Sequence, residues 1–370
     1  MQRALRLARR GLGATSPNPM VGAVLVNRGR VIGRGWHRRA GGPHAEVEAI
    51  GDATKRGEST VGSTLYVTLE PCSTHGRTPP CTNAICAAGI RTVFVAAVDP
   101  NPAHAGRGVR ILKRQGVAVT SGLLRDVSER LNEAFNHWIV NRTPYVTVKA
   151  AMTLDGKIAT ESGQSKWITG PGARDWGMRL RCASDAILVG INTVQSDNPN
   201  LTCRQRNAEV RSAPVGGSRL RRVVLDSRAR IPLNSRLVSD AHAEQTIVVV
   251  TGAAPARRVA ALSKRVTVWI CPGDLPRVDP GWLMTRLGSE PVTSLLVEGG
   301  GEVGASFFEK SLVHRVAFFY APKILGGNRT RKAVAGSGVE SMEFAPRLEN
   351  VEWRRVGADL LLLARVQSSR

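Results

Sequence analysis

The chain has 370 residues, of which 42% are hydrophobic and 22% are charged. This composition is typical of a globular protein, and the length favours two domains over a single core. No apolar run approaches the ~20 residues needed to cross a bilayer. The basic N-terminus also lacks the apolar segment of a signal peptide, so we expect a cytoplasmic protein with no membrane partner.

The formal net charge of +23 raises the question of nucleic-acid binding. The arginines are scattered along the whole chain, with short clusters only at RLARR, RLRR and WRR. Aromatic residues make up 5% of the chain and do not alternate with these clusters as a base-stacking platform would. A solvated basic surface with a few phosphate-binding arginines is the favoured interpretation, and no nucleic-acid partner is expected.

The first 142 residues alternate between apolar strands and short helices, which predicts a layered α/β/α domain. Pro79 and Pro80 start one of these helices, so Cys81 lies in its first turn. The expected strands are 21–26, 31–35, 64–68 and 92–97, and the expected helices are 3–10, 44–54, one that starts after Pro80, and 123–140.

The sharpest pattern in this first part joins the segment HAEVEAI to VTLEPCSTHGRTPPC. His44, Cys72 and Cys81 offer an imidazole and two thiolates, a sufficient ligand set for a catalytic zinc with the fourth position left to water. An H-x-E motif followed by P-C-x-x-C is typical of zinc nucleobase deaminases, although here eight residues separate the cysteines. Ordinary buried thiols are the alternative, but the order of these residue types favours zinc.

Glu46 lies two residues after His44 and is the acid that the metal does not need. Near the helix start it is placed to move protons between a metal-bound water and an amine leaving group. The helix N-terminus would stabilise a thiolate at Cys81. Cys86 on the same helix is assigned to packing. The six cysteines form no disulfide framework, so a reducing compartment is expected.

Arg142-Thr143-Pro144 is the expected hinge, after which the strand–helix pattern starts again. A long polar loop, TLDGKIATESGQSKWITG, follows the first strand of this second part. Residues 204–219 have little apolar pattern and are expected to form a mobile loop. The expected strands are 145–152, 186–190, 222–226, 247–251, 266–270 and 294–297, with a helix over 171–181.

A glycine-rich turn interrupts SLLVEGGGEVGASFF, where an apolar strand stops at Glu298 and a helix begins. Residues 299–304 match G-x-G-x-x-G, and the amides of such a turn suit a phosphate. A Rossmann dinucleotide fold would need an acid about 20 residues further on, where this chain has Ala321. A pyrophosphate loop in another α/β fold is favoured, and a glycine turn without a ligand is the alternative.

A polar cluster in GINTVQSDNPNLTCR also follows a buried strand. It contains Thr193, Asp197 and Arg204. Loops after strand ends are where α/β sheets bind ligands. By itself, Asp197-Asn198-Pro199 is equally well explained as a plain turn.

The chain resembles the bifunctional riboflavin-biosynthesis deaminase–reductase family in a series of motifs that occur in the same order. These motifs are TSPNPMVGAVLV, HAEVEAI, VTLEPCSTHGRTPPC, DPNP…GRG, LDGKIA…GQSKWITG, DNPNLTCR and VEGGG. The wide cysteine spacing is itself a feature of that family. The resemblance implies a cytidine-deaminase-like α/β/α domain at residues 1–142 and a dihydrofolate-reductase-like α/β domain at residues 143–370.

Two consecutive reactions are implied by this resemblance. The first is zinc-dependent hydrolytic deamination of 2,5-diamino-6-ribosylamino-4(3H)-pyrimidinone 5′-phosphate. The second is reduction of 5-amino-6-(5-phosphoribosylamino)uracil to the ribitylamino product by NADPH. The expected cofactors are therefore Zn²⁺ and NADPH, the expected partner is a small phosphorylated pyrimidine, and a homo-oligomer, dimer or tetramer, is expected.

The resemblance also carries site residues over to this chain. His44, Cys72 and Cys81 match the zinc ligands, and Glu46 matches the catalytic proton donor. The family often has Lys where this chain has Arg77, and either residue can meet a phosphate with different geometry. The positions that line the deaminase substrate pocket are Asn18, His37, Arg77, Asp99 and Asn101.

In the reductase half, the substrate positions are Ser165, Arg181, Leu201, Arg204 and Glu298. Lys149 and Asp155 lie beside the cofactor positions and are expected to help orient the ribose. The cofactor positions are Ala151, Trp167, Thr193, Asp197, Ser227, Gly300, Gly301, Glu302, Val303, Gly304, Ala305 and Ser306.

Two other functions compete with this interpretation. The first is a nucleic-acid-directed zinc deaminase whose C-terminal half is a binding module, which would bind tRNA and not NADPH. The second is a chain in which one half has lost activity and serves as an oligomerisation scaffold, although no motif residue indicates such a loss.

Overall fold

The structure is a computed structural model that describes residues 1–74, 79–203 and 220–367. Contacts divide the chain into two compact units, one from Met1 to Arg142 and one that starts at Thr143. The loop expected at 204–219 lies outside the described residues. Within the described ranges, no helix combines the length and apolar character that a membrane span requires.

The first unit is built on a five-stranded sheet with the order β2-β1-β3-β4-β5. β1 is antiparallel to both β2 and β3, whereas β3, β4 and β5 are parallel. Parallel neighbours need crossover helices, and these place helices on the faces of the sheet. The strands are β1 (Gly22–Asn27), β2 (Arg30–Trp36), β3 (Thr64–Leu69), β4 (Thr92–Ala97) and β5 (Ala118–Ser121).

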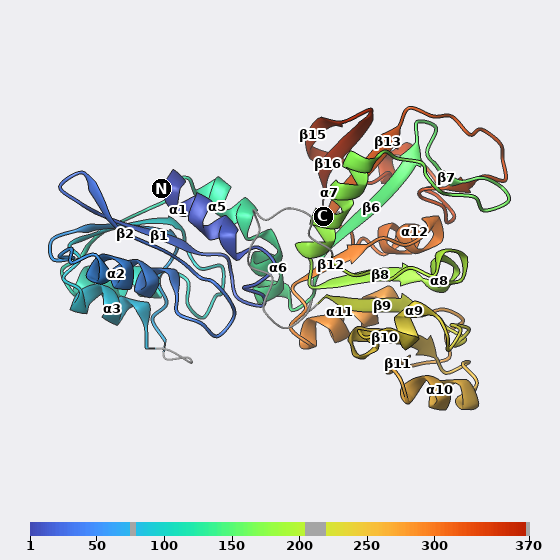
Figure 1. Cartoon of the computed structure of the whole chain (residues 1–370), viewed down its shortest axis with the longest axis horizontal. Helices are drawn as coiled ribbons and strands as arrows, with labels where there is room; N and C mark the ends of the chain where they lie inside the picture. Colours follow the sequence, from blue (N-terminus) through green and yellow to red (C-terminus); the bar gives the residue numbers. More distant parts are fainter. Residues whose placement is uncertain (75–78, 204–219, 368–370) are drawn as a thin grey trace. The chain divides into compact units, whose positions relative to one another are not determined.

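Helices cover both faces of this sheet, as Figure 1 shows with α2 and α3 on one side and α1 and α5 on the other. The helices approach the strands closely at glycines. A Cβ on Gly35 would collide with the Ala45 carbonyl of α2, and one on Gly22 would collide with the Ala4 carbonyl of α1. The three-layer α/β/α prediction is therefore confirmed. The helices are α1 (Gln2–Ala8), α2 (Ala45–Lys55), α3 (Cys81–Ala87), α4 (Arg107–Arg114), α5 (Arg125–Leu131) and α6 (Glu133–Asn141).

The single helix expected at 123–140 is two helices, and that prediction was wrong. The break falls at Asn132, whose backbone has φ −111° and ψ 25°. Its side chain accepts from the Met20 N–H at 2.8 Å and donates to the Met20 carbonyl at 3.0 Å. Because this pairing joins residues 112 positions apart, no local pattern signalled it.

The second unit contains a nine-stranded sheet with the order β11-β10-β9-β8-β12-β6-β13-β16-β15. The strands from β11 to β13 are parallel to their neighbours, and β16 and β15 add an antiparallel end. The larger strands are β6 (Tyr145–Thr153), β8 (Ala186–Gly190), β9 (Arg221–Leu225), β10 (Thr246–Thr251), β11 (Thr267–Cys271), β12 (Ser294–Val297), β13 (Arg315–Ala321), β15 (Leu348–Val356) and β16 (Asp359–Val366), and a small sheet pairs β7 (Lys157–Ala159) with β14 (Arg331–Lys332).

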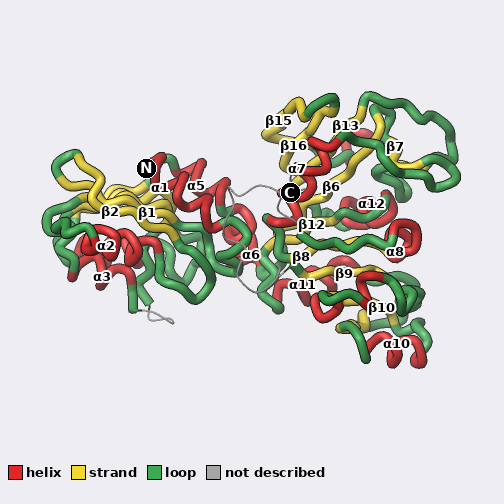
Figure 2. The backbone as a smooth tube through the Cα atoms, in the orientation of Figure 1, coloured by secondary structure: helices red, strands yellow, loops and turns green. Residues whose placement is uncertain are grey.

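Two apolar clusters cover the two faces of the large sheet. One contains Leu180 of α7 and Leu262 of α10, and the other contains Leu283 of α11 and Phe307 of α12. Figure 2 distinguishes these helices in red from the strands in yellow. The helices are α7 (Pro171–Cys182), α8 (Ile191–Asp197), α9 (Arg236–Ser239), α10 (Ala256–Ser263), α11 (Pro280–Ser289) and α12 (Gly301–Glu309).

The cysteine pattern gave no reason to expect a disulfide, but the structure pairs Cys182 with Cys203. Their Cα atoms are 5.2 Å apart, within the range that a disulfide requires. The bond joins the end of α7 to the segment that follows α8. The four other cysteines are free thiols.

Candidate functional site

Three potential metal ligands from separate segments meet in the first unit. The ligand atoms of His44, Cys72 and Cys81 all lie within 4.8 Å of one another. His44 Nδ1 is 3.2 Å from Cys81 Sγ and 3.4 Å from Cys72 Sγ. One imidazole nitrogen and two sulfurs at this spacing fit a tetrahedral zinc with one open position. Cys86 is absent from this group and packs against the core, as expected.

Local structure places each of these donors. His44 is the N-cap residue of α2, and Cys81 is the first residue of α3. Cys72 follows the buried strand β3, and its sulfur accepts the Cys81 backbone N–H at 3.3 Å. Two helix starts therefore face the end of one strand, and the positive ends of the helices favour thiolates there.

Hydrogen bonding within the group shifts the pKa values of the two thiols in opposite directions. The hydrogen bond from Cys81 lowers the pKa of Cys72 to about 4. The same bond raises the pKa of Cys81, and burial adds to that increase. The hydrogen bond with Cys72 also raises the pKa of His44. One proton therefore remains on Cys81 in the metal-free group, and a metal must displace it to gain the second thiolate.

Glu46 lies in the first turn of α2 and is only 3% exposed. Burial raises the pKa of its carboxyl to about 7. The nearby His44 opposes this increase, since its charge favours the carboxylate. A carboxyl that titrates near neutrality can both accept and return a proton, as a general acid/base must.

Asn18 and His37 form one wall beside the three donors. Asn18 Nδ2 lies 3.1 Å from His37 Nε2, and His37 Nδ1 lies 3.0 Å from the Pro43 carbonyl oxygen. The rings of His37 and His44 meet edge to face at 5.5 Å. Burial lowers the pKa of His37, which favours the neutral ring.

Asp99 and Asn101 lie on the loop after β4. The Asp99 carboxylate accepts the Asn101 backbone N–H at 2.9 Å, and burial raises the pKa of Asp99. The proximity of Cys72 contributes to this increase, so this loop lies near the donor group. Arg77, the fifth residue expected in this pocket, lies outside the described residues.

The second unit has a cavity of about 1980 Å³ at the carboxyl ends of β6, β8, β9 and β12. Ligands of α/β sheets bind at such an edge. Arg204 lies outside the described residues. The expected residues that line the cavity are Ala151, Ser165, Trp167, Arg181, Thr193, Asp197, Leu201, Ser227, Glu298, Gly300, Gly301, Glu302, Val303 and Ser306.

Gly304 and Ala305 are not among the residues of the described chain that line this cavity. Both are buried on the inner side of α12, where Gly304 approaches Val148 of β6. α12 starts at Gly301, and a Cβ on Gly301 would collide with the Lys332 carbonyl. The glycines thus allow close packing around the helix start, while Gly300 and Gly301 remain on the cavity wall.

Glu298 holds two cationic side chains at the cavity floor. Its carboxylate accepts from Lys149 Nζ at 2.8 Å and from Arg181 Nε at 2.7 Å. Burial alone would raise the pKa of Glu298, but Lys149 and then Arg181 lower it to about 2. Because the pKa of Glu298 is lower in the folded chain than in the unfolded chain, the ionised carboxylate stabilises the fold at pH values above about 4.5. This contribution is lost as the pH falls from about 4.5 toward 2.

The structure gives Asp155 contacts that the sequence did not predict. Its carboxylate accepts from Thr153 Oγ1 at 2.6 Å and from the Leu325 and Gly326 backbone N–H groups at 3.1 and 2.8 Å. The Thr153 bond is the main cause that lowers its pKa to about 2. Asp155 therefore anchors a neighbouring loop and is not among the described cavity-lining residues, whereas Lys149 lines the cavity.

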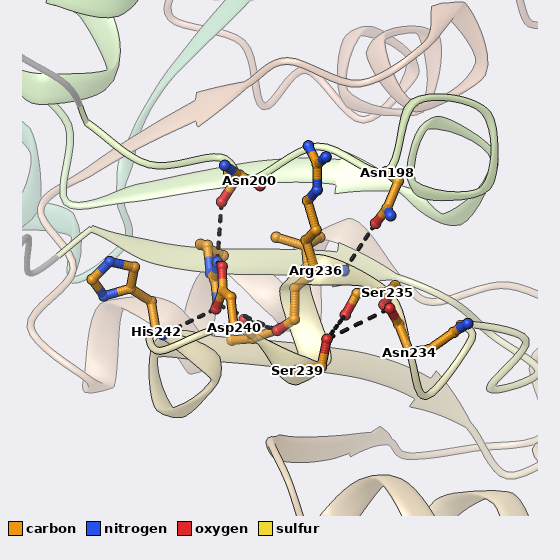
Figure 3. Close-up of polar contacts among 11 residues, drawn as sticks. Asn198, Asn200, Asn234, Ser235, Arg236, Ser239, Asp240 and His242 are labelled. Atoms are coloured by element: carbon orange, nitrogen blue, oxygen red, sulfur yellow. Dashed lines mark hydrogen bonds and ion pairs between the residues drawn. The ribbon is translucent and has the colours of Figure 1, made fainter.

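The loop between Asp197 and Leu201 is held by a polar cluster that the sequence did not indicate. Arg222 on β9 is 1% exposed and binds both oxygens of Asp240, at 2.7 and 2.8 Å. It also donates to the Asn200 carbonyl at 3.0 Å. Figure 3 labels both of these partners, Asn200 and Asp240. The buried Arg222 therefore fixes the backbone at Asn200, between Asp197, an expected cofactor contact, and Leu201, an expected substrate contact.

We expect Arg222→Met to lower the free energy of unfolding of the second unit by about 2–3 kcal/mol, because a buried charge pair loses its cation. Calorimetry of the full chain measures this loss. Arg221→Met is the matched control, since Arg221 forms a longer and partly exposed ion pair with Glu290, at 3.6 Å. Equal stabilities for the two variants would contradict the role assigned to Arg222.

Comparison with known proteins covers both units. The cytidine and deoxycytidylate deaminase zinc-binding region matches residues 1–97, and the RibD C-terminal domain matches residues 144–362. The riboflavin biosynthesis protein RibD of Actinobacillus pleuropneumoniae is 41% identical over 362 residues, which cover 98% of this chain and 93% of that protein.

Solved structures agree with these matches. Form 1 of Acinetobacter baumannii RibD has a TM-score of 0.87 and 34% identity, covering 99% of this chain and 97% of that chain. A diaminohydroxyphosphoribosylaminopyrimidine deaminase/5-amino-6-(5-phosphoribosylamino)uracil reductase from Thermotoga maritima has a TM-score of 0.81 and 35% identity, with the same coverage. The chain therefore belongs to the RibD family of riboflavin biosynthesis proteins.

Proposed function

We propose that this chain carries out two consecutive steps of riboflavin biosynthesis. Residues 1–142 deaminate 2,5-diamino-6-ribosylamino-4(3H)-pyrimidinone 5′-phosphate, and residues 143–370 reduce the resulting 5-amino-6-(5-phosphoribosylamino)uracil with NADPH. The observation that carries the proposal is the meeting of His44, Cys72 and Cys81 around the buried Glu46, in a chain that also has the reductase cavity. Full-length similarity to RibD proteins favours this function over a nucleic-acid-directed deaminase.

For deamination, His44, Cys72 and Cys81 are the proposed zinc ligands. Bound zinc would supply the Lewis acidity that activates a water molecule for attack on the pyrimidine. Glu46 accepts the first proton of the attacking water and delivers it to the ring nitrogen. It then takes the remaining proton of the added hydroxyl group and delivers it to the departing amine as the ring carbonyl forms. His37 and Asn18 are proposed to orient the ring, together with Asp99 on the loop after β4.

For reduction, NADPH would supply the hydride, and the protein supplies position and charge. Glu298, held by Lys149 and Arg181, is proposed to contact the substrate at the cavity floor. The amides at the start of α12 suit the cofactor pyrophosphate. Arg181 and Arg204 are proposed to hold the substrate phosphate, because a guanidinium binds phosphate with paired hydrogen bonds.

We expect Cys72→Ala to abolish both zinc binding and ammonia release, because only two of the three protein ligands, His44 and Cys81, remain to hold the metal. Elemental analysis of the purified full chain gives the zinc content, and an ammonia assay gives deamination. NADPH oxidation with the aminouracil substrate should continue, since the reductase cavity lies in the second unit.

Cys86→Ala is the matched control, because Cys86 is a free thiol of α3 outside the donor group. This variant should keep both zinc and deamination. Stoichiometric zinc in Cys72→Ala, or loss of zinc in Cys86→Ala, would contradict the proposed ligand set.

We propose a homo-oligomer, a dimer or tetramer, because the end strand β15 exposes Val351 and Trp353, at 48% and 58%, and is exposed along most of its length. A strand edge of this kind is a ready site for pairing. We also propose a cytoplasmic location, since phosphorylated pyrimidines and NADPH are charged and do not cross membranes unaided.

A further inference from the structure

Glu70 is a buried acid that the proposed reactions do not use. It follows β3 directly and is 6% exposed. Its carboxylate accepts three backbone N–H groups from a distant segment: Asp99 at 3.1 Å, Gly106 at 2.9 Å and Val109 at 3.1 Å. A carboxylate can accept several such bonds, and here both of its oxygens are used.

These bonds hold both ends of one loop. Asp99 lies where the chain leaves β4, and Gly106 and Val109 lie at the start of α4. The first N–H groups of a helix have no partner within the helix, and they favour a negative charge. Glu70 therefore closes the loop over residues 99–109 by binding its entry and its exit.

The backbone of Glu70 leads directly to the metal donors. Its own N–H donates to the Ala97 carbonyl at 2.9 Å, which fixes it to β4, and Pro71 and Cys72 follow in sequence. α4 packs against this segment so closely that a Cβ on Gly108 would collide with the Pro71 carbonyl. One residue thus connects the Cys72 segment to the loop that carries Asp99 and Asn101.

The loop has further internal order that depends on its anchors. The Asp99 side chain accepts the Asn101 N–H at 2.9 Å, and the Asn101 side chain accepts the Ala103 N–H at 3.1 Å. A shift of the Asp99 backbone therefore moves the side chains of both Asp99 and Asn101. Misplacement of contact groups by about 1 Å can reduce a rate ~100-fold.

We propose that Glu70 is a positioning residue for deamination, which holds the wall formed by Asp99 and Asn101 at a fixed distance from the Cys72 metal donor. This role rests on the proposed deaminase function, because it requires that the 99–101 loop contacts the pyrimidine. Glu70 acts through backbone amides and does not itself touch the substrate or the metal.

The test is Glu70→Gln in the zinc-loaded full chain, since Gln keeps the size of Glu but replaces one accepting oxygen with a donor. The deamination kcat/KM should fall about 10- to 100-fold, mainly through a higher KM. Zinc content and reductase kcat/KM should stay at the values of the unsubstituted chain. Glu58→Gln is the matched control, because the Glu58 carboxylate forms an ion pair with the exposed Arg30, the single ion pair found for it among the residues that the structure describes.

A purely structural role for Glu70 would give a different result. The folded fraction would then retain the normal KM, and only the amount of active protein would fall. A normal KM in zinc-loaded Glu70→Gln would overturn the proposal. So would loss of zinc together with activity, because Glu70 would then support the metal donor and not the loop.

Val109→Pro provides a second variant if Glu70→Gln does not fold. Proline lacks the N–H that Glu70 accepts and is tolerated in the first turn of a helix. This variant should also have a higher deamination KM, and an unchanged KM would overturn the proposal. Failure of the unsubstituted chain to release ammonia would overturn the proposed function itself, and the role of Glu70 with it.

Discussion

Glu46→Gln should keep the zinc and lower the deamination rate by about 10²–10⁴, the range expected for loss of a general acid/base. The amide has nearly the same shape as the carboxyl but cannot carry a proton between water, ring nitrogen and amine. Zinc content by elemental analysis and single-turnover ammonia release from the same sample measure the two effects separately. Reduction of the aminouracil by NADPH should be unaffected.

Glu48→Gln is the matched control for this experiment. Glu48 lies two residues later on α2 and forms an ion pair with Arg38 at 3.1 Å, near the surface. It should deaminate at the normal rate. Near-normal turnover by zinc-loaded Glu46→Gln would refute the role of Glu46.

Glu298→Gln should reduce the kcat/KM of reduction about 100-fold while deamination continues. The substitution removes the negative charge between Lys149 and Arg181, and loss of one partner of a buried charge network costs about 2–5 kcal/mol. The two cations would then repel each other at the cavity floor. Steady-state NADPH oxidation and ammonia release, measured on one preparation, give the two activities.

Glu290→Gln is the corresponding control, because the ion pairs that Glu290 forms with Arg286 and Arg221 are partly exposed to solvent. Its reductase activity should be normal. A Glu298→Gln enzyme that reduces its substrate normally would show that the buried network serves the fold alone. Equal loss of deamination and reduction would count against a separate second site.

The metal donor group could be predicted because its signals are local. His44 and Glu46 lie within three residues, and Cys72 and Cys81 each follow a proline at a strand end or helix start. Periodicity also predicted β1 to β4, where apolar runs are bounded by turn residues. These features depend on neighbours in sequence, which a pattern can report.

Residues that act over long distances in the chain could not be predicted in the same way. Glu70 binds amides up to 39 positions away, and Arg222 binds the Asn200 carbonyl 22 positions away. The sequence shows at Glu70 an acidic residue directly after an apolar run, which does not by itself indicate the amides that it binds. Asp155 was expected to help orient the ribose, and no pattern indicated its contacts with Leu325 and Gly326, which lie 170 and 171 positions away.

The C-terminal strands were also missed, for two different reasons. β13 and β16 are short apolar runs, which periodicity cannot distinguish from buried helix. β15 is exposed along most of its length and reads LENVEWRRV, so it lacks the one-sided apolar alternation of a covered strand. Its strand form comes from pairing with β16.

The central claim is that one chain holds a zinc-dependent deaminase site and an NADPH-dependent reductase site. Its most direct test is mass analysis of the products formed from the diaminopyrimidinone phosphate by the zinc-loaded chain, with and without NADPH, in ¹⁸O-labelled water. We expect a product whose new ring carbonyl carries the label when NADPH is absent, and the same product with two added hydrogens when NADPH is present. Unchanged substrate in both reactions, or label-free product, would contradict it.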